Sequence, residues 1–169
     1  MRSNHHTRTR SLILLVLAGL IGASVAAGEP TSDIKAAGCF IPTPKGVVLG
    51  IGTFRGDIRI PMGKHEAGET ARETAIRETH EETGIEVTTV RLLRTLENGR
   101  VFLFLCAPVI PIKDYSLLAP VDIFEIARVV VLDPVTMLSH DGRKIDNPWR
   151  FADNRALIVE LYAQYKRSQ

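Results

Sequence analysis

One stretch decides the fold, residues Gly63–Ile85, which read Gly-Lys-His-Glu-Ala-Gly-Glu-Thr-Ala-Arg-Glu-Thr-Ala-Ile-Arg-Glu-Thr-His-Glu-Glu-Thr-Gly-Ile. The second half predicts a helix over 70–83. Thr70 is followed three residues later by Glu73, which forms a capping box, and Gly84 is the residue type expected just past a helix end. Small side chains recur every four residues and suit close packing on a sheet. These are Ala71, Ala75, Thr79 and Thr83.

Three acidic residues of this helix lie on one face. Glu78, Glu81 and Glu82 are spaced i, i+3 and i+4, so their side chains project within roughly 100° of one another. Like charges at these spacings destabilise a helix by about 0.2–0.5 kcal/mol per pair. A divalent cation reverses this effect, because Mg²⁺ prefers hard carboxylate oxygens as ligands. The alternative is a solvated charged face, partly balanced by Arg77 at i−4 from Glu81. The three glutamates alone favour that alternative.

The surrounding pattern changes this interpretation. Seven polar or glycine positions stand in one register: Gly63, Glu69, Arg77, Glu78, Glu81, Glu82 and Gly84. With residue frequencies near ~6%, chance agreement is on the order of 10⁻⁹ per starting position. The pattern resembles the Nudix box, Gly-x5-Glu-x7-Arg-Glu-U-x-Glu-Glu-x-Gly-U, where U is apolar. Thr79 stands where an apolar residue is usual, and Met62 stands where many members have a first glycine. Neither is a metal-binding carboxylate.

The resemblance implies a role for each motif position. Glu78, Glu81 and Glu82 are expected to bind Mg²⁺ or Mn²⁺. One carboxylate must also take a proton from water, for which Glu78 is the first choice and Glu125 the second, although Glu125 could equally be a plain surface acid. Arg77 is expected to orient a glutamate, and Glu69 is expected to stabilise the loop–helix junction. Gly63 and Gly84 are expected to let the chain turn into and out of the helix.

Three cations on the approach to the motif could contact substrate phosphates, although such residues at loop ends are more often merely solvated. They are Arg55, Arg59 and Lys64.

The rest of the chain predicts a mixed α/β domain with helices covering a sheet. An Asn-Gly step between two apolar runs predicts a hairpin, and Asp133-Pro134 predicts the start of a helix. The expected strands are 36–41, 47–51, 58–60, 87–96, 101–108 and 127–132, with a last helix over 153–166. The resemblance implies the Nudix fold, in which a mixed β-sheet is sandwiched between helices (α/β/α).

The N-terminus predicts export. Residues 1–27 hold three arginines and no acid, and Leu12–Ala27 is uncharged and ends in small residues. This is typical of a secretory signal peptide, which is followed here by a linker over 28–35 and the domain over 36–169. The alternative is an uncleaved anchor, and the 17-residue run Ser11–Ala27 is at the lower limit for spanning a bilayer. We expect a periplasmic or extracellular protein, with membrane contact only if the leader stays attached.

Composition and charge narrow the partners. The 169 residues favour one domain. Without residues 1–27 the chain has 18 basic and 19 acidic residues, a net charge of −1, which argues against a nucleic-acid partner. Cys39 and Cys106 both sit in apolar runs. We expect two buried thiols acting as small hydrophobes, although an oxidising destination would permit a disulfide.

The resemblance implies an enzyme that acts on a small molecule. The expected reaction is metal-dependent hydrolysis of a diphosphate bond, by water attack on phosphorus. The expected substrate is a nucleoside diphosphate linked to another moiety, or a similar organic diphosphate. A second hypothesis is a non-catalytic module of the same fold that binds a nucleotide or sugar nucleotide. A third is a membrane-tethered interaction domain without chemistry.

Overall fold

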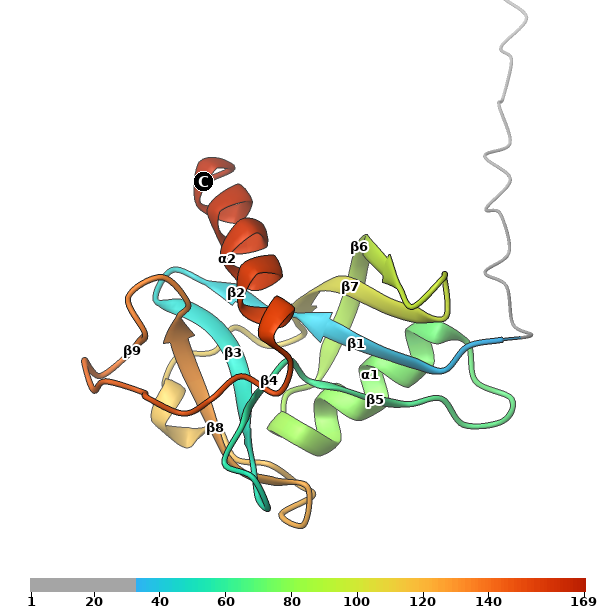
Figure 1. The fold of residues 1–169 in the computed structure, drawn as a ribbon, viewed down its shortest axis with the longest axis horizontal. Helices are drawn as coiled ribbons and strands as arrows, with labels where there is room; N and C mark the ends of the chain where they lie inside the picture. Colours follow the sequence, from blue (N-terminus) through green and yellow to red (C-terminus); the bar gives the residue numbers. More distant parts are fainter. Residues whose placement is uncertain (1–32) are drawn as a thin grey trace, which may run out of the picture.

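The computed structural model describes residues 33–169 (Figure 1). The leader and nearly all of the linker lie outside the described residues, so the predictions made for them stay predictions. Within residues 33–169, neither helix is both long and apolar enough to cross a membrane.

Two sheets form the centre of the domain. The first has the strand order β5-β1-β7-β6 and is mixed, because β1 runs parallel to β7 and antiparallel to β5. Its strands are β1 (Ala36–Phe40), β5 (Met62–Lys64), β6 (Val87–Leu96) and β7 (Val101–Pro108). The second has the order β2-β3-β8-β9, with β4 also paired to β3. Its strands are β2 (Pro42–Thr43), β3 (Gly46–Gly52), β4 (Ile58–Arg59), β8 (Ile126–Asp133) and β9 (Leu138–Ser139).

The two long helices, α1 (Ala71–Thr83) and α2 (Ala152–Arg167), cover opposite faces of these sheets. A short 3₁₀ helix, η1 (Tyr115–Leu117), lies in the connection between β7 and β8. In β1, Phe40 packs in the core cluster that contains α2, whereas Cys39 packs in the cluster that contains α1. In β7, Leu103 and Phe104 divide in the same way. Because neighbouring residues of a strand point to opposite faces, the sheets lie between the helices. The predicted α/β/α sandwich is confirmed.

Helix α1 begins and ends as its sequence predicts. The Thr70 hydroxyl accepts from the Glu73 N–H at 3.2 Å, and the Glu73 carboxylate accepts from the Thr70 N–H at 2.8 Å. Such a cap stabilises a helix by about 1 kcal/mol. Gly84 ends the helix in the left-handed region, with φ 69°. The stripe of small residues is fully buried against the sheet, as expected, so this helix lies close to the strands.

The predicted hairpin is also present. Strands β6 and β7 pair antiparallel, and Glu97, Asn98 and Gly99 all have positive φ in the connecting turn. Strands β1 and β3 lie in different sheets instead of pairing with each other, and the short strand β2 between them pairs with β3. Both edges of β1 are occupied, one by β5 and the other by β7.

The helix predicted to start at Asp133-Pro134 is wrong. The Asp133 carboxylate does accept the N–H groups of Val135 and Thr136, at 2.9 and 3.0 Å, as an N-cap residue would. The structure holds only one turn, because Met137 adopts a left-handed φ of 60°. The chain then pairs with β8 as strand β9. The prediction that Asp133 caps a turn is therefore correct. The turn does not continue as a helix, because the chain returns to the sheet.

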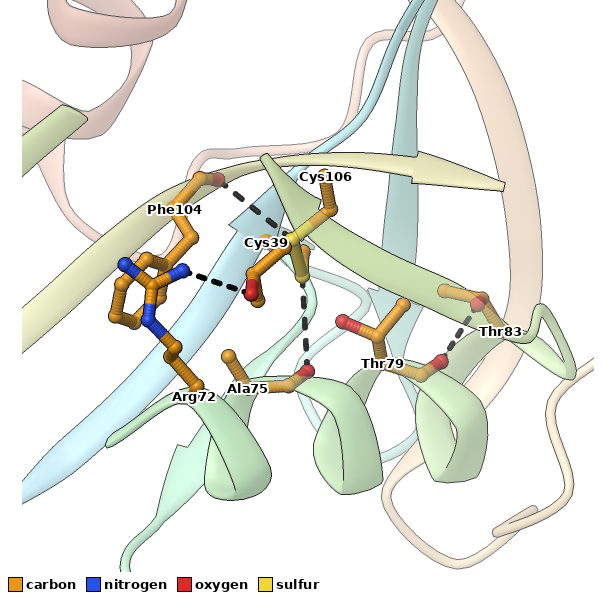
Figure 2. The surroundings of a disulfide bond; sticks show 8 residues. Cys39, Arg72, Ala75, Thr79, Thr83, Phe104 and Cys106 are labelled. Carbon is orange, nitrogen blue, oxygen red and sulfur yellow. Dashed lines mark hydrogen bonds between the residues drawn. A yellow bond between two sulfur atoms is a disulfide. The ribbon is translucent and has the colours of Figure 1, made fainter. Parts of the chain in front are cut away.

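The two cysteines form a disulfide, so the prediction of two free thiols is wrong (Figure 2). Both are buried, as expected. Cys39 in β1 is the register partner of Phe104 in β7, and Cys106 lies two residues further along the same face. The bond therefore joins two neighbouring strands across 67 residues of sequence, beneath helix α1 and beside Ala75. Only the pairing of β1 with β7 brings the two sulfur atoms together.

We predict that the double variant Cys39→Ala/Cys106→Ala is less stable than the oxidised wild type by about 2–4 kcal/mol, because a long loop is no longer closed in the unfolded chain. Urea unfolding of both proteins measures the difference. Wild type unfolded with a reductant is the control and should match the double variant. Equal midpoints for the oxidised wild type and the variant would contradict the prediction.

Candidate active site

Helix α1 turns its three glutamates toward different surroundings. Glu82 is 2% exposed and Glu78 is 8% exposed, whereas the side chain of Glu81 is 42% exposed. The Glu82 carboxylate accepts a hydrogen bond at 2.8 Å from the backbone N–H of Met62, at the start of β5. Two of the three predicted metal-binding carboxylates, those of Glu78 and Glu82, are therefore buried between the helix and β5. The third, that of Glu81, is partly exposed to solvent.

Arg77 joins the predicted glutamates to one another. Its guanidinium donates to both Glu69 oxygens, from Nε at 2.7 Å and from Nη2 at 3.1 Å. Its Nη1 donates to Glu78 at 2.9 Å and to Glu81 at 3.1 Å. Its Nη2 also donates to the carbonyl of Lys64 in β5, at 2.9 Å. Because the fork is planar, these contacts set the positions of the carboxylates as well as their charge balance.

Glu69 holds the loop before the helix in place. It accepts from the Thr74 hydroxyl at 2.7 Å and from the Glu66 N–H at 3.2 Å, in addition to its contacts with Arg77. The hydrogen bond from Arg77 is the main reason why the pKa of Glu69 falls from 4.5 to about 2. These contacts lie at the loop–helix junction, where the resemblance places the role of Glu69.

Gly63 serves a purpose different from the expected turn. It lies within strand β5, and it is not among the glycines with positive φ. A Cβ at this position would lie 2.0 Å from the Glu78 Oε2 atom. The missing side chain therefore makes room for the Glu78 carboxylate against the strand. Gly84 does turn the chain, and a Cβ there would also lie 2.5 Å from the carbonyl oxygen of Ala119.

Glu125 belongs to the same cluster of negative charge. It is exposed and lies just before β8, where its carbonyl accepts from the Thr53 N–H at 3.0 Å. Burial, with the charges of Glu78 and Glu125, raises the pKa of Glu82 to about 8, against the lowering effect of the hydrogen bond from the Met62 N–H. Burial likewise raises the pKa of Glu78, together with the charges of Glu81 and Glu125 and against the effect of Arg77. Burial and neighbouring acidic groups therefore both oppose the ionisation of Glu78 and Glu82.

The three predicted phosphate contacts differ in position. Arg59 is mostly buried and is held by Asp57, with Nη2–Oδ1 and Nε–Oδ1 distances of 2.8 and 3.1 Å. Its charge lowers the pKa of Glu82, so Arg59 lies near the acidic cluster. Lys64 in β5 and Arg55 in the turn before β4 have exposed side chains. The sequence analysis did not single out Asp57. The one feature that could have indicated its role is that an acidic residue stands two positions before Arg59.

The residues present suit a divalent cation, although no ready-made cage exists. Within residues 33–169, no three acidic, histidine or cysteine side chains converge closely enough to enclose a metal as they stand. The available donors are carboxylate oxygens, the ligands that Mg²⁺ and Mn²⁺ prefer. Burial is the main reason why the pKa values of Glu78 and Glu82 are raised, and a bound cation would stabilise the ionised form of both carboxylates. Substrate phosphates and water would complete the coordination.

Part of the chain resembles a known domain family. A family model described as the NUDIX domain matches residues 34–114. None of the curated proteins matches the chain. A NUDIX hydrolase structure from Nitrosomonas europaea is similar, with a TM-score of 0.59, 20% identity, and coverage of 79% of this chain and 72% of that one.

Two further solved structures resemble the chain. An ADP-ribose pyrophosphatase from Streptococcus suis has a TM-score of 0.55 at 16% identity, over 79% of this chain and 92% of that one. An Ap4A hydrolase from C. elegans has a TM-score of 0.53 at 19% identity, over 79% and 98%. At these identities the likeness shows that the fold is shared.

We predict that Glu69→Gln removes an acid-sensitive part of the stability. Because the pKa of Glu69 is about 2 in the fold and 4.5 ordinarily, its ionised form is stabilised by folding. This contribution is present above pH 4.5 and is lost as the pH falls toward 2. The melting temperatures of wild type and Glu69→Gln should therefore differ most at neutral pH and converge in acid.

The exposed neighbour Glu66 provides the matched control. Glu66→Gln changes the same charge in the same loop, and its melting temperature should follow that of wild type at every pH. A gap between wild type and Glu69→Gln that stays constant from pH 7 to about pH 2 would show that the ion pair does not cause it.

Proposed function

We propose that this chain is a Nudix hydrolase that hydrolyses a diphosphate bond with the help of Mg²⁺ or Mn²⁺, since a family model described as the NUDIX domain matches residues 34–114. The substrate is a nucleoside diphosphate linked to another moiety, or a similar organic diphosphate. One observation carries the proposal. The buried carboxylates of Glu78 and Glu82 lie within the field of Glu125, and the main local cation, Arg77, is already shared among three glutamates.

Glu78, Glu81 and Glu82 would hold the cation. When bound, it supplies the positive charge that lets an anionic diphosphate approach an acidic site. Arg77 orients Glu78 and Glu81 through its Nη1 atom. The Met62 N–H holds one oxygen of Glu82, so that carboxylate is fixed by the strand as well as by the helix. Arg59, held by Asp57, is the cation placed to meet a phosphate oxygen.

A carboxylate of the protein removes the proton from the attacking water. Glu78 is the first choice, because burial raises its pKa and makes it a stronger base, while Arg77 fixes its orientation. Glu125 is the second choice, and its exposure leaves it free to approach a water. The water oxygen bonds to phosphorus as the bond to the bridging oxygen breaks. That oxygen leaves with the electron pair and takes up a proton, so an internal diphosphate yields two phosphate monoesters.

The similar structures support this substrate class at the level of the fold. One of them is named as an ADP-ribose pyrophosphatase and another as an Ap4A hydrolase. Both names describe cleavage between phosphates of a nucleotide.

We also propose that the protein works outside the cytoplasm, in the periplasm or beyond the cell. The sequence of residues 1–27 predicts export, and the Cys39–Cys106 bond is of the kind that persists in oxidising compartments. Mass spectrometry of the chain recovered from its host checks both points. We expect a mature N-terminus just after Ala26 or Ala27 and a mass lower than that of the reduced chain by two hydrogen atoms. An intact leader on a chain with two free thiols would refute this location.

We predict that the protein releases phosphate monoesters from a panel of diphosphates in the presence of Mg²⁺, detected with an added phosphatase. EDTA should abolish this activity, and Glu82→Gln should lower it by at least about 100-fold. The variant keeps an acceptor for the Met62 N–H. It should remain folded, and above pH 8 it should be no less stable than metal-free wild type, because burial opposes the charge of Glu82.

A second variant tests the geometry without removing any carboxylate. Gly63→Ala would force Glu78 away from strand β5 and should also reduce activity. Gly68→Ala is its control, because a Cβ there meets nothing within 4 Å, and only the strain of its φ of 94° is added. If wild type were inactive across the panel but stabilised by a nucleotide, a non-catalytic binding module would be the better description.

A further inference from the structure

Three large apolar side chains stand in water beside the acidic cluster. Phe54 is 88% exposed, Phe124 is 75% exposed and Ile123 is 65% exposed. Phe54 lies in the turn between β3 and β4, and the other two lie in the loop that leads into β8. We call these three residues the apolar rim. Exposure of large apolar side chains next to a polar site is typical of a ligand-binding surface.

Hydrogen bonds tie the two segments of the apolar rim together. The Thr53 hydroxyl donates to the carbonyl of Ile123 at 3.0 Å, and the Thr53 N–H donates to the carbonyl of Glu125 at 3.0 Å. Asp122 shapes the second segment, since its carboxylate accepts the N–H groups of Phe124 and Glu125 at 2.8 and 3.3 Å. In Figure 1 the tip of the β3–β4 turn and the loop before β8 lie together at the lower edge of the molecule.

The apolar rim borders the proposed catalytic groups. Phe124 immediately precedes Glu125, whose charge acts on both Glu78 and Glu82. The loop is also fastened to the metal-binding helix, because the Asp122 N–H donates to the carbonyl of Glu81 at 2.9 Å. A diphosphate held at the acidic cluster would therefore have its substituent next to Phe124.

The chemistry of the apolar rim favours a hydrocarbon substituent over a base. Reading a base requires free donors and acceptors. Here the hydroxyl of Thr53 and the Oδ1 atom of Asp122 are engaged in the hydrogen bonds of the loops themselves. Ile123 and the neighbouring Val121, which is 60% exposed, add aliphatic surface to that of the two phenyl rings. Aliphatic side chains match a hydrocarbon chain and contribute little to the stacking of a flat base.

We infer that the apolar rim binds an apolar chain attached to the diphosphate, so that the substrate class is an amphiphilic diphosphate with a prenyl or similar lipid group. This inference rests on the proposed function. Water attacks phosphorus and the bridging P–O bond breaks. A prenyl diphosphate gives prenyl monophosphate and inorganic phosphate, and a lipid-linked sugar diphosphate gives two monoesters.

The test compares two diphosphates that differ only in chain length. Steady-state rates are measured on the full chain with Mg²⁺, using C15 farnesyl diphosphate and C5 dimethylallyl diphosphate. Wild type should prefer the C15 substrate by at least about tenfold in kcat/KM, mainly through a lower KM. Phe54→Ala/Phe124→Ala should lose most of this preference. Phe151→Ala is the matched control, because Phe151 is also exposed but lies at the start of α2, and it should keep the preference.

A second measurement separates the inference from the proposed function. Calorimetry with a C15 methylenediphosphonate, which cannot be hydrolysed, reports binding by itself. Binding that is lost in the double variant supports the inference even if no diphosphate is cleaved. Equal rates for both chain lengths, or a preference that survives the double variant, overturn it while leaving the hydrolase intact. A greater loss on ADP-ribose than on the C15 substrate would show that the rim reads a base, which also overturns it.

Discussion

The guanidinium of Arg77 is the contact on which the rest of the site depends. It is the one group that touches Glu69 before the helix, Glu78 and Glu81 on it, and the backbone of β5 at Lys64. A planar cation with several donors can hold carboxylates at set angles, which a lysine could not. Without this cation, these three acidic side chains within one loop and helix would repel each other. The arrangement therefore offsets part of the negative charge and sets the positions of the carboxylates.

The sheet sets the distances that this network needs. Small residues along α1 let the helix lie close to β1, and Gly63 leaves a space in β5 that the Glu78 carboxylate fills. Beneath the helix, the Cys39–Cys106 bond joins β1 to β7. The platform that carries the acidic groups is thus braced covalently on the side away from solvent. Rigidity of this kind suits a site whose chemistry consists largely of positioning charges around a phosphate.

Local signals in the sequence predicted much of the fold. The caps of α1, the small-residue stripe and the hairpin at Asn98-Gly99 follow from rules that act over a few residues, and each was confirmed. The helix predicted after Asp133 failed because the same local signal was overruled by the pairing of β9 with β8. The free-thiol prediction failed for a related reason, since strand order decides which cysteines meet.

The sequence by itself determined the resemblance to the Nudix box and the helix that bears the acids, because seven residues in one register and one amphipathic helix are local properties of the chain. It also nominated Glu125 and Arg59, without any means of placing them. The tertiary structure alone decided that Glu125 joins the cluster, that Asp57 holds Arg59, and that Phe54 lies on the segment bonded to Ile123. These contacts join residues brought together by strand pairing and loop packing. The alternation and spacing of side chains along one chain carry no record of which distant segment will lie beside them.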